Sequence, residues 1–308
     1  MKKKFNLLLT EENGGVVIIV AAAMVFLLGL TAMVTDVGSI AYARRKMVTA
    51  ADAAALAGAQ ELVNNPAQAE ARALEYASKN GAEPENVTVT VSGNNCEITV
   101  SASQVVDFSL AKVLGFHSTS VSARAKAAIK PVRAVTGIVP FIVPMPPPGE
   151  DYNYGEEVLL KVGNWNDAPI GSGNFGAIAL GGTGANNYRN NIKFGYQGVI
   201  AIGDYVDTEP GNMSGPTNQG VKYRLDHNDT IVIIPLYDSS ITDVSGRGSI
   251  QVAGFACFEI TGVEGSGNMC NVTGKFIKWF LPNNASPSSP GDPAGENDFG
   301  VYNLVLVE

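Results

Sequence analysis

The stretch Gly15–Val63, GVVIIVAAAMVFLLGLTAMVTDVGSIAYARRKMVTAADAAALAGAQELV, decides the fold of this 308-residue chain. From Val16 to Val34 it contains no charged residue, and Thr31 is its only polar residue. These 19 residues would span roughly 28 Å as a helix, enough to cross the hydrocarbon core of a bilayer. Because no helix-breaking pair follows, the sequence predicts one long helix, with residues 16–35 in the membrane and the rest outside it.

The length of the apolar run also predicts that this anchor is retained. The apolar region of a cleaved signal peptide is shorter, at about 7 to 15 residues. Basic residues flank both sides of the run in equal number: Lys2, Lys3 and Lys4 before it, and Arg44, Arg45 and Lys46 after it. A long domain after the span is translocated largely regardless of its charge. We therefore expect a single-pass protein of the cell membrane with a cytoplasmic N-terminus and extracytoplasmic domains.

The rest of the sequence predicts an α+β fold. Asn65-Pro66 begins a second helix that ends at Gly81, and alternating apolar residues over 87–91 and 96–100 predict a β-hairpin. A long alternating strand follows at 118–129, and short apolar runs between turn residues predict a mostly β region after 150. The expected domains are 1–15 cytoplasmic, 16–35 transmembrane, 36–130 a small pilin-like α+β module, 131–150 a Pro-rich linker, and 151–308 a β-rich domain.

Composition limits the classes of function. The formal net charge is −8, and residues 151–308 carry 17 Asp and Glu against 8 Lys and Arg, without a basic cluster. Nucleic acid is therefore not an expected partner. The chain has no G-x-S-x-G motif, and its two histidines, His117 and His227, have no partner visible in the sequence. The sequence predicts no catalytic residue and no cofactor.

The helix continuation carries small residues on one face. Val48, Ala51, Ala55, Gly58 and Leu62 recur at helical spacing, so this stripe permits close approach of another element. Two interpretations remain open: it binds a partner helix, or it packs on the protein's own sheet. Asp36, just past Val34, either caps or pairs with a partner's charge there or is a plain interfacial acid.

A few residues are candidates for metal binding or a disulfide. Asp204, Asp207 and Glu209 could share a calcium ion if their loop curls, although a solvated acidic turn explains them more simply. Asp238 and Ser240 follow an apolar run as a metal-binding D-x-S turn would, with a polar turn as the simpler interpretation. Among the three cysteines, Cys257 and Cys270 form a possible disulfide. The GSGNFG pattern at 171–176 lacks a strand before it and a helix after it, so it predicts turns rather than a dinucleotide site.

The segment DVGSIAYARRKMVTAADAAALAGAQEL, Asp36–Leu62, resembles the N-terminal segment of TadG-like proteins of Tad/Flp pilus assembly. The shared pattern is an apolar span, Asp-x-Gly, an aromatic residue with basic residues, and the Ala-rich block Ala50–Ala59. The stretch FSLAKVLGFHSTSVSARAKA also resembles the extracytoplasmic module of that family. The resemblance implies a bacterial, non-enzymatic component of a type IV (Tad) pilus, used for adhesion. Its expected partners are the lipid bilayer and other Tad pilus proteins, reached through the N-terminal helix, with a homo-oligomer or filament as a further possibility.

Two alternative functions come from other classes. One is a surface-displayed adhesin or carbohydrate-binding module, which would need aromatic residues on one exposed face; the candidates are Trp165, Tyr188, Tyr196, Tyr205 and Trp279. The other is a cell-surface hydrolase, which would need two carboxylates converging in a cleft; the candidates are Asp204, Asp226 and Asp238.

Overall fold

The computed structural model describes most of the chain from Gly15 onward. The described residues are 15–147, 149–161, 176–209, 211–241, 244, 247–265, 270–281, 285–287 and 299–307. They form two compact units. Unit 1 comprises Met1–Ala127 with Leu306–Glu308, and unit 2 comprises Ala128–Val305. The fold is α+β, as the sequence predicted.

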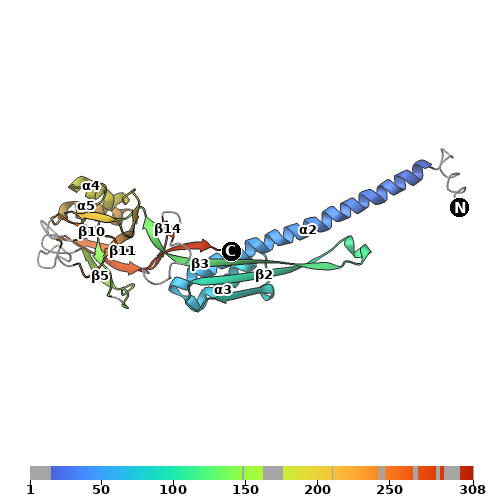
Figure 1. Ribbon diagram of the computed structural model, residues 1–308, viewed down its shortest axis with the longest axis horizontal. Helices are drawn as coiled ribbons and strands as arrows, with labels where there is room; N and C mark the ends of the chain where they lie inside the picture. The colour runs from blue at the N-terminus through green and yellow to red at the C-terminus, as the bar shows by residue number, and fades with distance from the viewer. Residues whose placement is uncertain are drawn as a thin grey trace. The chain divides into compact units, whose positions relative to one another are not determined.

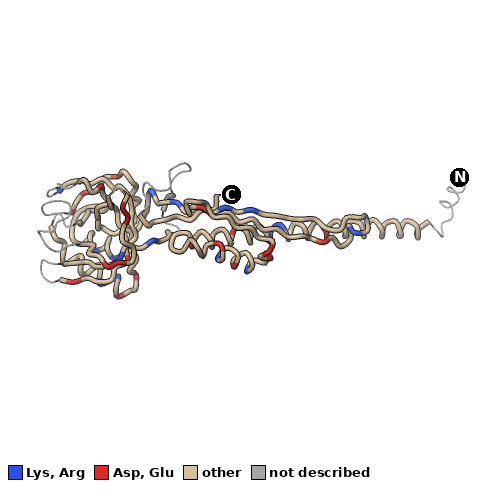
Figure 2. Tube along the Cα trace, turned by 90° about the horizontal axis from the view of Figure 1, so that it is seen from below, with Lys and Arg blue, Asp and Glu red and all other residues tan. Residues whose placement is uncertain are grey.

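The longest element is helix α2, Gly15–Asn64, drawn in blue in Figure 1. It is unbroken from the apolar run into the Ala-rich segment. Within the described part of the chain, it is the one helix long and apolar enough to cross a membrane. Figure 2 shows no charged residue along its N-terminal part. The large side chains there are exposed, for example Ile19 at 70% and Val25 at 71%.

The remainder of unit 1 packs on the C-terminal half of α2. Helix α3, Ala69–Lys79, and strand β2, Glu97–Asp107, both contact this half. Strand β1, Val87–Val91, pairs antiparallel with β2, which confirms the predicted hairpin. Strand β3, Ser118–Val135, lies next to β2 in the sheet order, and its residues from 128 onward belong to unit 2. The short 3-10 helices are η1 (Pro66–Gln68), η2 (Pro84–Asn86) and η3 (Ala111–Leu114).

Unit 2 contains most of the sheet structure. One sheet has the strand order β4-β9-β11-β12-β5, and a smaller one has the order β10-β8-β6. In addition, β7 and β14 pair with the end of β3, and β13 runs parallel to β15. The strands are β4 (Val143–Pro144), β5 (Glu157–Lys161), β6 (Ile178–Ala179), β7 (Ile200–Ala201), β8 (Tyr205–Thr208), β9 (Ile231–Tyr237), β10 (Ser249–Gln251), β11 (Gly254–Glu264), β12 (Asn271–Ile277), β13 (Trp279–Phe280), β14 (Ala285–Pro287) and β15 (Val301–Leu306).

Two helices in unit 2 differ from the mostly β prediction. They are α4, Ala185–Phe194, and α5, Ser214–Asp226. Their sequences are polar, and α5 includes Gly and Pro, so neither shows a clear apolar stripe. Tertiary contacts stabilise them instead: the Arg224 side chain, buried in α5, donates hydrogen bonds to the carbonyl oxygen of Ile192 and, over 2.7 Å, to the carboxylate of Asp229.

Part of the segment predicted as a Pro-rich linker, 131–150, lies in the core of unit 2. Ile138, Val139, Phe141 and Ile142 are at most 1% exposed. The amide of Val139 donates to the carbonyl of Ile233 in β9 over 3.0 Å, so this stretch is tied to the sheet. The prolines led to the prediction of a spacer, whereas the apolar residues between them form part of the core.

Candidate functional site

The most unusual polar group in the described part of α2 is the carboxylate of Asp36. It lies directly after the apolar run, and only 6% of the residue is exposed. Its Oδ1 accepts a hydrogen bond from the amide of Ser109 at 2.7 Å. Its Oδ2 accepts two more, from the amides of Leu110 at 3.2 Å and Ala111 at 2.7 Å. Asp36 therefore binds the backbone of the loop between β2 and β3, at the start of η3.

These hydrogen bonds stabilise the charged form of the carboxylate. The amide of Ser109 makes the largest contribution to lowering the pKa of Asp36, and the amides of Ala111 and Leu110 act in the same direction. Burial opposes them, while the nearby charge of Lys112 helps. A carboxylate that accepts several backbone amides is characteristic of a capped helix start. Of the two interpretations of Asp36, the structure therefore favours the capping role, with a loop of its own chain as the partner.

The loop bound by Asp36 covers residues 108–116, FSLAKVLGF. Its exposed side chains are mostly apolar: Leu110 is 43% exposed, Val113 85% and Phe116 64%. In Figure 1 the β2–β3 hairpin runs along α2, and its turn points toward the N-terminal part of that helix. The loop therefore lies beside the point where the apolar run of α2 ends.

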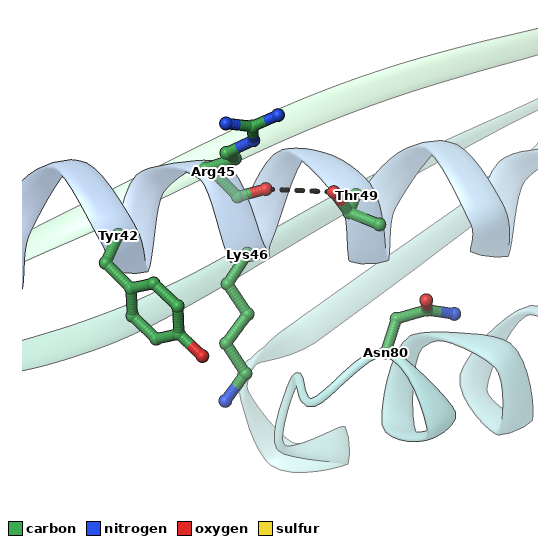
Figure 3. A pocket seen from close by; sticks show the side chains of 5 residues that line it. All are labelled: Tyr42, Arg45, Lys46, Thr49 and Asn80. Atoms are coloured by element: carbon green, nitrogen blue, oxygen red, sulfur yellow. Dashed lines mark hydrogen bonds between the residues drawn. The ribbon is translucent and has the colours of Figure 1, made fainter.

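A shallow pocket of about 260 Å³ lies farther along α2. Figure 3 shows its lining side chains, which come from α2 and from the end of α3: Tyr42, Arg45, Lys46, Thr49 and Asn80. The hydroxyl of Thr49 donates to the carbonyl of Arg45 over 3.1 Å. With two cationic groups and no carboxylate in the lining, this pocket suits an anionic group better than a cation.

The small-residue stripe of α2 packs within unit 1. Ala51 and Ala55 are fully buried, and Leu62 is 3% exposed. A Cβ atom on Gly58 would lie 2.5 Å from Cδ1 of Ile98 and 3.1 Å from Cβ of Ala73, so a larger residue would clash with β2 and α3. The second of the two interpretations, packing on the protein's own elements, is thus the one the structure supports. Val48, at 42% exposed, faces outward.

The structure does not gather the predicted calcium ligands. Asp204 accepts the amide of Ala201 at 2.8 Å, and Asp207 accepts the hydroxyl of Ser249. Glu209 is buried and accepts the amide of Gly184. Across the described residues, no three His, Cys, Asp or Glu side chains lie close enough together to hold a metal ion. The three acids therefore serve separate loop contacts.

The Asp238–Ser240 turn matches the simpler of its two interpretations. Oδ1 of Asp238 accepts the amide of Ser240 at 2.8 Å, and this bond lowers the pKa of the carboxyl. Such an Asx turn after a buried strand needs no metal. In the GSGNFG pattern, residues 171–175 lie outside the described part of the chain. Gly176 is described and takes a positive φ of 75°, which suits a turn.

The register of the β11–β12 hairpin overturns the predicted disulfide. Cys257 lies opposite Ile277, whereas Glu264 lies opposite Asn271, the residue after Cys270. The two cysteines are therefore at opposite ends of the hairpin, about 20 Å apart at the usual rise of a strand. A disulfide needs Cα atoms less than about 7 Å apart. Both side chains are instead buried in the core, at 0% and 1% exposed.

The aromatic residues proposed for ligand binding do not share one face. Tyr188 is buried, and its hydroxyl lies 3.4 Å from that of Thr217. Tyr205 and Trp279 are exposed at 70% and 43%, but they belong to different sheets. Trp165 lies outside the described residues. This arrangement does not favour the adhesin alternative.

The histidines and the remaining carboxylates are exposed at the surface. His117 is exposed beside the loop bound by Asp36, and His227 stacks on Tyr223 at 4.1 Å between ring centroids. Asp204, Asp226 and Asp238 are exposed, and none of them lines the pocket beside α2. The hydrolase alternative thus gains no support.

Together, the long apolar helix and the α+β module packed on its second half define a class: proteins with an N-terminal apolar helix that continues into a globular module. Comparison with known proteins gives a more specific likeness for the helix. Residues 14–61 match the Tad family, described as Flp pilus-assembly TadE/G-like. The match covers nearly the whole of α2. No curated protein and no solved structure matches the chain.

Proposed function

We propose that the protein is a non-enzymatic, membrane-anchored component of a bacterial Tad/Flp pilus apparatus. The observation that carries the proposal is the coincidence of the Tad match, residues 14–61, with a helix whose first part is exposed and apolar and whose second part is buried in unit 1. Exposed large apolar side chains over one whole helix half are costly in water and favourable in lipid.

In this proposal α2 crosses the membrane once, with the N-terminus in the cytoplasm and everything after Asp36 outside it. The domain boundaries predicted at 16–35 and 36–130 belong to the same proposal. Its function is assembly, anchoring or incorporation as a minor subunit, in support of adhesion to surfaces. The partners are the lipid bilayer and other Tad pilus proteins.

The structure points to a different face of α2 for protein partners than the small-residue stripe that the sequence suggested. Since the small-residue stripe is covered by α3 and β2, the contact with a partner falls to the outward face of α2. This face carries Val48 and Tyr42, the latter 72% exposed. The pocket lined by Arg45 and Lys46 opens on α2 as well and suits an acidic group of the partner.

The test follows the intact protein in cells that make the pilus. A tag at the C-terminus is followed by immunoblot after the cells are sheared and, in parallel, after protease is added from outside. Full-length protein that stays with the membranes and loses its tag to protease supports a membrane-retained component in the proposed orientation. Release with sheared filaments at a reduced mass supports incorporation as a processed minor subunit. A tag protected in intact cells but digested in opened cells contradicts the orientation, and extraction without detergent contradicts the anchor.

A further inference from the structure

We propose that the loop 108–116 between β2 and β3 inserts into the interface of the bilayer beside α2, as a second membrane contact. This inference rests on the proposed crossing of the membrane by α2. It accounts for the exposed apolar side chains of this loop, which a membrane anchor formed by α2 alone does not explain.

The first argument is position. Asp36 is two residues beyond Val34, which corresponds to about 3 Å along a helix axis. The amides of Ser109 and Ala111 both lie 2.7 Å from its carboxylate oxygens. The loop is thus held at the level where the apolar run ends. If Val34 lies at the edge of the hydrocarbon, the loop lies within the headgroup region, which adds several ångströms on each side of the hydrocarbon core.

The second argument is composition. Between Asp107 and His117, the loop carries a single charge, that of Lys112. Val113 and Phe116 are 85% and 64% exposed, and Leu110 is 43% exposed, so three large apolar side chains of this short loop lie at the surface. Aromatic and aliphatic side chains next to a Lys form the usual set for insertion at an interface, where the ammonium group reaches lipid phosphates.

The third argument is the backbone. Any part of the loop that reaches the hydrocarbon must satisfy its amides internally, since the acyl chains supply no acceptor. The amide of Phe108 donates to the carbonyl of His117 over 3.0 Å, and that of Phe116 donates to Ala111 over 3.1 Å. Those of Val113 and Gly115 donate to carbonyls within the loop. The amides at the start of η3 are the ones taken by Asp36. The buried carboxylate of Asp36 therefore satisfies amides of this loop that would otherwise need water as an acceptor.

The experiment measures the depth of spin labels in the full-length protein, reconstituted into vesicles of phosphatidylcholine and phosphatidylglycerol. The background variant is Cys96→Ser, because Cys257 and Cys270 are buried and stay unlabelled in the folded protein. Three variants of this background are compared, each with one added cysteine. Val113→Cys reports on the loop, and Val25→Cys reports on the anchor. Asn94→Cys lies in the turn at the other end of β2, about 35 Å away at the usual rise of a strand.

Each label is exposed to oxygen, which concentrates in lipid, and to a water-soluble nickel complex. The expected result is that labels at 113 and 25 collide several-fold more with oxygen than with nickel, while the label at 94 shows the reverse. A label at 113 as accessible to nickel as the one at 94, with 25 in lipid, overturns the loop insertion and leaves the anchor intact. Nickel access at 25 overturns the anchor and the loop insertion together. Protection of 113 from both reagents with spin–spin broadening shows that a second copy covers the loop, which also overturns the proposal.

Discussion

The two halves of α2 show how one helix can be built for two environments. In the first half, large side chains such as Val25 and Leu28 are exposed at 71% and 65%. In the second half, Ala50, Ala54 and Ala59 are fully buried. The second half also carries charged residues, but its buried face consists mainly of small side chains, which allow α3 and β2 to approach the helix closely. The half that packs on its own chain therefore differs from the half left for lipid both in its charges and in the size of its apolar side chains.

Charges in the first half are expected to have the largest effect. In Leu27→Lys/Leu28→Lys, each lysine near the middle of the span costs about 2.5 to 3.5 kcal/mol of insertion free energy. The protein should therefore lose most of its retention in carbonate-washed membranes. The matched control, Tyr42→Lys/Val48→Lys, places two lysines on exposed positions of the second half and should remain membrane-bound. Equal retention of both variants would show that the first half does not lie in lipid.

Two methionines on the same helix give the next largest difference. Met47 is fully buried and Met33 is 67% exposed. Met47→Ala should lower the stability of unit 1 by about 2 to 5 kcal/mol, since it leaves a cavity, whereas Met33→Ala should have an effect near zero. Because the chain has two units, hydrogen exchange of the β1–β2 amides is a better measure than a single melting curve. Similar protection in both variants would contradict the packing of the second half.

The sequence predicted this helix well because its signals are local. The apolar run, the Ala-rich block and the alternation in β1, β2 and β3 can each be read over about 20 residues or fewer. The helices α4 and α5 were missed because their stability comes from contacts such as Arg224 with the carbonyl of Ile192. Gly220 in α5 marks a close approach: a Cβ there would lie 2.7 Å from the Ile192 side chain. Isolated glycines of this kind lower confidence in a helix when only sequence is available.

At the candidate site, the sequence identified Asp36 but not the groups that bind it, because these depend on tertiary contacts. Asp36 stood out in the sequence because a carboxylate directly follows an apolar run. Its partners could not be identified, because Ser109 and Ala111 are more than 70 positions away along the chain and use backbone amides rather than side chains. The predicted disulfide between Cys257 and Cys270 was wrong because the sequence does not show the register of the β11–β12 hairpin. Although the two cysteines are 13 residues apart along the chain, this register leaves them at opposite ends of the hairpin.

Two glycines of α2, Gly58 and Gly38, provide a finer test of the comparison. Gly58→Ala should destabilise unit 1, because overpacking costs about 1 to 3 kcal/mol and exceeds the gain of about 1 kcal/mol in helix propensity. Around Gly38 nothing lies within 4 Å of an added Cβ, so Gly38→Ala should keep the propensity gain and stabilise the helix. Hydrogen exchange of the α2 amides measures both effects: protection should fall in Gly58→Ala and rise in Gly38→Ala. A stabilising Gly58→Ala would mean that α3 and β2 can move away from the helix at little cost.

The smallest expected effect lies at the boundary between the two halves, in the variant Asp36→Asn. The pKa of Asp36 is lowered from its usual value of 3.8, chiefly by the amide of Ser109. A carboxylate with a lowered folded-state pKa stabilises the protein fully above pH 3.8, and this contribution disappears as the pH falls through the folded-state pKa. The stability difference between the natural protein and Asp36→Asn should therefore be constant near neutral pH and shrink below pH 3.8. Hydrogen exchange of the 108–116 amides across this range measures it. A difference that stays constant down to the most acidic pH would show that the ionised carboxylate does not hold the loop.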